Sequence, residues 1–91
     1  MSEQKNSKIH SVILEQRQRL NMSGVRQVVG FEDDTVVLDT EMGILTVRGG
    51  GLKIGAFSTE SGDINIEGNI SALIYSEKEN ERGGFFRRMM R

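Results

Sequence analysis

The chain has 91 residues, of which 36% are hydrophobic and only five are aromatic, so it forms one small domain with a modest core. It contains no cysteine, which excludes disulfides, thiol chemistry and cysteine metal sites, and its single histidine, His10, cannot build a multi-histidine metal site. The polar start of the chain and the lack of an apolar run of about 18 residues lead us to expect a cytosolic protein without a secretory signal or a membrane span.

Charge is distributed unevenly along the chain, although the net charge is only -1. Residues 1–26 carry a charge of +3, residues 27–81 carry -8 and residues 82–91 carry +4. The acidic body is expected to bind polyanions poorly, and the basic end is expected to act as a separate functional unit.

The first 76 residues divide into two parts. Residues 1–8 are polar, and we expect them to be disordered. Residues 9–76 are expected to form an all-β domain, because short runs alternate apolar and polar residues and favour β-branched side chains. About eight short strands are predicted, at residues 12–14, 20–22, 25–31, 35–40, 44–48, 52–54, 63–67 and 70–75.

Turn-forming residues separate these runs, at residues 23–24, 32–34, 41–43, 49–51, 61–62 and 68–69. Their close spacing leaves no room for crossover helices, so the sequence predicts mostly antiparallel strands in a meander, a small barrel or a sandwich. A short β-solenoid is the alternative architecture. We interpret the three glycines at 49–51 as a tight turn or a bulge, because no helix and no P-loop lysine follows them to make a phosphate site.

No set of residues in the sequence indicates catalysis, so we expect neither an enzyme nor a cofactor. His10 has no nearby base or nucleophile and is expected to be an ordinary residue at a strand edge. The acidic cluster Glu32, Asp33 and Asp34 offers oxygen ligands for calcium or magnesium but too few for a calcium loop. We interpret it as a solvated hairpin turn.

Residues 77–91 form a charged linker followed by a basic, aromatic tail. The candidate binding residues of the tail are Phe85, Phe86, Arg87, Arg88, Met89, Met90 and Arg91. Bulky apolar residues among arginines suit either an anionic membrane surface or a groove on a partner protein. At about 1 kcal/mol per basic residue near anionic lipid, membrane attachment would be reversible. The alternative is that the tail folds back on the acidic body, where its phenylalanines cap the β core.

Several blocks of the chain, in their order and spacing, resemble the YabP/YqfC family of endospore-forming bacteria. They span residues 14–25 (LEQRQRLNMSGV), 29–34, 38–49, 52–54, 62–68 and 70–76. The ending at residues 84–88 (GFFRR) resembles the YabP branch. The resemblance covers about residues 10–76 and the basic tail.

The resemblance implies a non-enzymatic sporulation protein of the mother cell that is needed for assembly of the spore cortex and coat. It also implies a scaffold or interaction module at the outer forespore membrane and the membrane protein YabQ as a partner. Exposed edge strands predict homo-oligomers. The alternative function is a small Sm-like barrel that binds nucleic acid, which residues 29–54 suggest. The charge of the body and the scarcity of aromatic residues for stacking argue against that alternative.

Overall fold

The computed structural model describes residues 9–77, which form a single antiparallel sheet without a helix. Its strands are β1 (Ser11–Glu15), β2 (Arg19–Ser23), β3 (Val25–Glu32), β4 (Thr35–Thr40), β5 (Gly43–Ser58) and β6 (Asp63–Ser76). Their order in the sheet is β1-β2-β6-β5-β4-β3, and all five ladders are antiparallel. The all-β prediction is therefore confirmed. The sheet is open, because β1 and β3 lie at its two ends, and it is not a solenoid.

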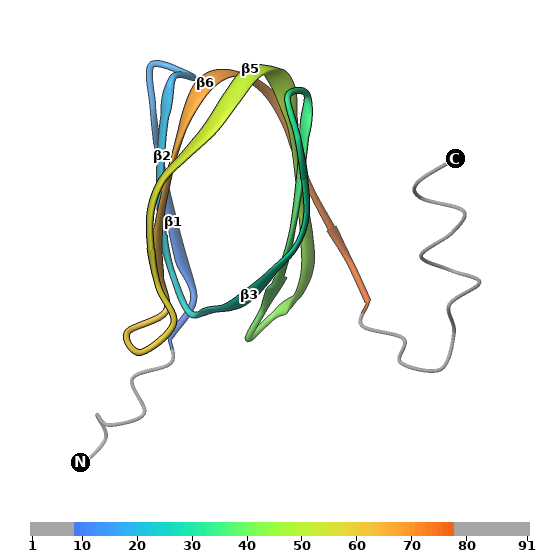
Figure 1. Cartoon of the computed structure of the whole chain (residues 1–91). Coiled ribbons are helices and arrows are strands. Elements are labelled where there is room, and N and C mark those ends of the chain that lie inside the picture. Colours follow the sequence, from blue (N-terminus) through green and yellow to red (C-terminus); the bar gives the residue numbers. More distant parts are fainter. Residues whose placement is uncertain (1–8, 78–91) are drawn as a thin grey trace.

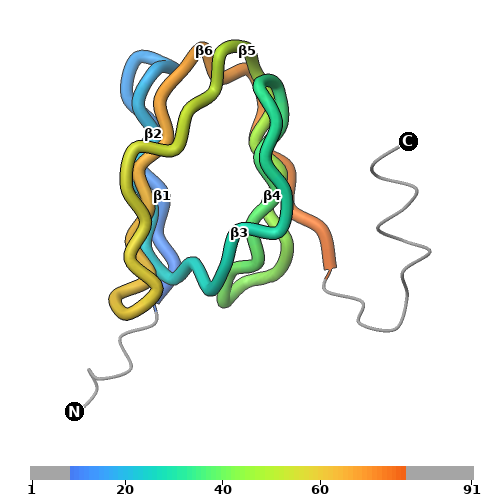
Figure 2. Tube along the Cα trace, viewed as in Figure 1, coloured from blue at the N-terminus to red at the C-terminus, as the bar shows by residue number. Residues whose placement is uncertain are grey.

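The two long strands, β5 and β6, fold this sheet over on itself (Figures 1 and 2). Each of them runs up one side of the molecule, bends at the top and continues down the other side (Figure 1). The β1 layer contains β1, β2, residues 63–67 of β6 and residues 53–58 of β5. The β4 layer contains β3, β4, residues 43–48 of β5 and residues 70–76 of β6.

Glycines make the bend between the layers possible. Gly50 of β5 pairs with Asn69 of β6, and the register then shifts as far as the next pair, Lys53 with Glu67. A Cβ on Gly49 would lie 2.0 Å from the carbonyl oxygen of Asn69, so only glycine fits that close approach. The interpretation of residues 49–51 as a bulge is confirmed.

The same bend corrects the predicted number of strands from eight to six. The runs at 44–48 and 52–54 are one strand, β5, and the runs at 63–67 and 70–75 are one strand, β6. The prediction was wrong there because glycines that interrupt a strand and glycines that end it look alike in the sequence.

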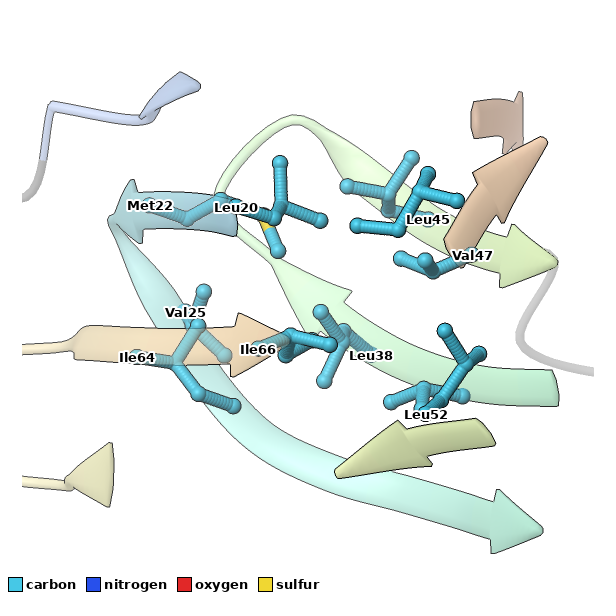
Figure 3. Close-up of a cluster of buried hydrophobic side chains, with 11 residues drawn as sticks. Leu20, Met22, Val25, Leu38, Leu45, Val47, Leu52, Ile64 and Ile66 are labelled. Atoms are coloured by element: carbon cyan, nitrogen blue, oxygen red, sulfur yellow. The ribbon is translucent and has the colours of Figure 1, made fainter. Parts of the chain in front are cut away.

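The core lies between the two layers, where the inner faces of the sheet meet (Figure 3). In the β1 layer Leu20 and Ile66 point inward and are fully buried, whereas Asn21 and Asn65 beside them point outward. The buried cluster contains Leu20, Met22, Val25, Val36, Leu38, Leu45, Val47, Leu52, Ile64, Ile66 and Ile70. Strand alternation therefore accounts for the core of this layer.

Candidate functional site

The predicted binding residues of the tail, Phe85, Phe86, Arg87, Arg88, Met89, Met90 and Arg91, lie outside the residues that the structure describes. Within residues 9–77 no group of acidic, histidine or cysteine side chains could hold a metal ion. No helix in that range is long and apolar enough to cross a membrane. The candidate sites of the described domain are therefore surfaces and hydrogen-bonded pairs.

The acidic cluster forms the turn between β3 and β4, and its backbone braces the glycine bend. The carbonyl oxygen of Asp33 accepts a hydrogen bond of 2.8 Å from the amide of Leu52. The carbonyl oxygen of Asp34 accepts one of 3.1 Å from the amide of Gly49. This arrangement agrees with the interpretation of the cluster as a hairpin turn, and it gives that turn a structural task.

His10 lies just before β1 and is half-buried in a hydrogen-bonded pair with Tyr75. Its Nδ1 lies 2.8 Å from the carbonyl oxygen of Ser23, which only accepts, so Nδ1 carries the proton. In the neutral imidazole, Nε2 then accepts a hydrogen bond of 2.5 Å from the hydroxyl of Tyr75. Burial raises the pKa of this phenol above its ordinary value. The pair fixes the histidine ring in one orientation and joins two distant parts of the chain.

The outer edge of β1 is the clearest surface for adding another strand. β1 pairs with β2 in an unbroken register, and no other strand of residues 9–77 pairs with it. Ile13 is 57% exposed and Leu14 is 37% exposed. At the other end of the sheet, β3 is interrupted by two register shifts, which bend an edge and protect it from pairing. The β1 edge has neither a bulge nor a lysine to protect it.

The outer face beside this edge is shallow and combines small polar side chains with apolar ones such as Ile13 and Ala56. Asn65 Nδ2 donates a hydrogen bond of 2.8 Å to Asn21 Oδ1, and the hydroxyls of Ser11 and Ser23 lie 2.9 Å apart. Together with neighbouring residues they line a groove of about 490 Å³ across β1, β2, β5 and β6. Because these side chains are short, another polypeptide can approach the sheet closely here.

A row of charges crosses the same outer face next to the groove. The register places Glu15 beside Arg19, Arg19 beside Glu67, and Glu67 beside Lys53. The signs therefore alternate over four strands, and Glu15 and Arg19 approach to 3.8 Å. A partner whose charges alternate in the opposite order can therefore pair with this row.

The sequence predicted exposed edge strands but did not identify which strand has the free edge. The signal was present in residues 11–15 (SVILE), where three apolar residues stand together without proline or lysine. The pairing of His10 with Tyr75 was missed, since nothing local in the sequence connects residues that far apart.

Comparisons with known proteins place the chain in a family. The sequence model of the YabP family matches residues 6–82. Spore protein YabP of Bacillus subtilis (strain 168) is 32% identical over 84 residues, which make up 90% of this chain and 84% of that protein. The resemblance noted in the sequence is therefore confirmed, and the chain belongs to the YabP family.

Proposed function

We propose that this chain is a non-enzymatic scaffold of the developing spore, which acts in the mother cell during assembly of cortex and coat. Its membership of the family of the spore protein YabP supports a role in sporulation. The observation that carries the scaffold role is the regular, apolar edge of β1, next to a shallow groove of mixed apolar and small polar side chains. Nucleic-acid binding is not favoured, because residues 27–81 carry a charge of -8.

The geometry of β1 fits a second copy of the chain. Two β1 strands can pair antiparallel about a two-fold axis at Ile13, so that Ile13 lies opposite the partner's Ile13. Ser11 then lies opposite the partner's Glu15, and no like charges face each other. Such pairing joins two sheets into one continuous sheet and buries the exposed isoleucines between them.

Substitution of Ile13 tests this assembly. In Ile13→Lys a charge is placed on the edge while the core stays intact, because this side chain faces outward. The matched control is Val29→Lys, which changes a β-branched residue, 43% exposed, on the bulged edge of β3. Size-exclusion chromatography with light scattering should give a mass well above 10.2 kDa for the natural chain and for Val29→Lys, but the monomer mass for Ile13→Lys.

Two results would count against the scaffold. One is a natural chain that stays monomeric at high concentration. The other is equal behaviour of the two lysine variants, which would show that assembly does not use the β1 edge.

We further propose that the arginines of the tail bring the assembly to the outer forespore membrane. Support comes from the charge of +4 on residues 82–91. Vesicle co-sedimentation compares the full chain with a chain that ends at Arg82. Binding of the full chain alone, only to anionic vesicles and more weakly as salt rises, is expected. If neither chain binds, contact with a membrane protein such as YabQ replaces direct binding to lipid.

A further inference from the structure

The outer face of the β4 layer is buried, although it points away from the core. In β4, Val36 and Leu38 belong to the core cluster, so Val37 between them faces outward. Val37 nevertheless is only 1% exposed. Thr46, opposite it on β5, is only 6% exposed. A valine on an uncovered sheet face keeps much of its surface in water, so this face is covered.

No strand of the described domain provides that cover. Within residues 9–77 the strands that pair with β4 are β3 and β5, which lie edge to edge with it in the same sheet. Gly30 of β3 lies opposite Val37, and it has no side chain to shield a neighbour. The strands that pair with β4 therefore do not explain the burial of Val37.

The sequence of the two layers agrees with a covered face. In the β1 layer Ile64 and Ile66 alternate with the outward Asn65, as in a strand that is wet on one side. In the β4 layer residues 36–38 (VVL) are apolar without a break, as in a strand that is buried on both sides. Ile74 of β6 pairs with Thr46 on the same face and is 45% exposed, so the cover lies over Val37 and Thr46 and leaves Ile74 at its border.

We propose that the cover is the C-terminal segment of the same chain, residues 83–91, docked on the outer face of the β4 layer. β6 ends at Ser76, which pairs with Ile44 in this layer, so the chain leaves the sheet at the border of the covered face. The six residues that follow Glu77 up to Gly83 span up to about 20 Å, which is enough to turn back over Thr46.

Composition distinguishes this segment from the other end of the chain. Residues 1–8 (MSEQKNSK) offer Met1 as their one large apolar residue, whereas residues 83–91 offer Phe85, Phe86, Met89 and Met90. Charge also favours the C-terminal segment, because residues 82–91 carry +4 and residues 27–81 carry -8. Asp39 contributes negative charge on the docking face itself, next to Ile44.

This docking is separate from the assembly role, because it places the apolar side chains of the tail in an intramolecular site. The arginines then provide the contact with anionic lipid, while the phenylalanines and methionines stay on the protein. The docking face and the β1 edge lie on different layers, so the two interactions can be tested separately.

Thiol accessibility tests the docking, since the chain has no cysteine and a single introduced thiol gives the whole signal. Thr46→Cys places that thiol under the proposed tail. Its reaction with a thiol reagent should be slow in the full chain and about tenfold or more faster in a chain that ends at Arg82. The control Asn21→Cys, on the exposed outer face of the β1 layer, should react equally fast in both lengths.

A second variant keeps the test decisive if the shortened chain fails to fold. The full chain with Phe85→Ser and Phe86→Ser should show the same acceleration at Thr46→Cys, with an unchanged far-ultraviolet circular dichroism spectrum. An unchanged rate in either folded variant would overturn the proposal. Protection that grows with protein concentration would overturn it as well, because a second copy would then be the cover.

Discussion

The hydroxyl of Tyr75 donates a hydrogen bond of 2.5 Å to Nε2 of His10, 65 residues away along the chain. His10 precedes β1, whereas Tyr75 shares the inner face of the β4 layer with its cross-strand neighbour Leu45. The bend at Gly49–Gly51 joins the layers at one end, and this pair joins them at the other. An open sheet is thereby held closed over its core at both ends.

Removal of the hydroxyl in Tyr75→Phe should lower the free energy of unfolding by about 0.5–1 kcal/mol, because Nε2 of His10 loses its hydrogen-bond partner. Urea unfolding of this variant, of His10→Ala and of the double variant gives the coupling energy between the two side chains. If the effects of the two substitutions simply add, the hydrogen bond does not contribute to stability.

The ionisation of Tyr75 provides a pH test. Burial raises the pKa of this phenol above 10.0, because the charged phenolate is disfavoured there. The unfolded chain therefore loses the proton first as pH rises, and this contribution to stability is complete below pH 10.0 and is lost as pH passes through the raised pKa.

Phenolate absorbance reports this titration directly, because Tyr75 is the only tyrosine and the chain has no tryptophan. The folded chain should titrate at a higher pH than the chain in urea. Coinciding curves would contradict burial as the cause. Tyr75→Phe should remove this part of the loss of stability at alkaline pH.

The fold class was predictable because its signals are local. Alternation such as Ile64, Asn65 and Ile66 predicts a strand with one wet face, and the structure has that strand. The bend was not predictable, since it depends on the pairing of Gly50 with Asn69, which only the folded sheet establishes. The local signal of a glycine is the same in a turn and in a bulge.

The candidate sites also divide into those with a local sequence signal and those that depend on the folded sheet. The tail was evident from composition alone, because arginines and phenylalanines gather in residues 82–91. The openness of the β1 edge depends on the strand order, which places β1 at one end of the sheet, with β2 as its one neighbour among the described strands. The covered face at Val37 was not predictable, because it depends on the contrast between the outward position of this side chain in β4 and its exposure of only 1%.

The bend itself yields a prediction from two neighbouring glycines. Gly49→Ala should destabilise the fold by about 3 kcal/mol, because the new Cβ meets backbone and the strands must separate. In contrast, a Cβ on Gly50 has no atom within 4 Å. Gly50→Ala should therefore leave stability within about 0.5 kcal/mol of the natural chain. Thermal unfolding measures both variants, and equal effects would refute this account of the bend.

Two buried threonines provide the last prediction. Thr46 Oγ1 is buried and has no hydrogen-bond partner among the described residues. Thr46→Val keeps the shape of the side chain and removes the unsatisfied hydroxyl, so it should raise the free energy of unfolding by about 1 kcal/mol. In Thr40, by contrast, Oγ1 donates to the carbonyl oxygen of Gly43 at 2.8 Å and accepts from the amide of Met42 at 3.0 Å.

Thr40→Val is therefore the matched control, and it should destabilise the fold by about 1–2 kcal/mol because the amide of Met42 and the carbonyl of Gly43 lose their partner. Urea unfolding compares the two variants in the full chain and in a chain that ends at Arg82. If the tail covers Thr46, the gain from Thr46→Val shrinks in the shorter chain, where water reaches the hydroxyl. The loss from Thr40→Val stays the same, because Thr40 faces the interior between the layers. An equal gain from Thr46→Val in both chains would mean that the tail does not shield this hydroxyl.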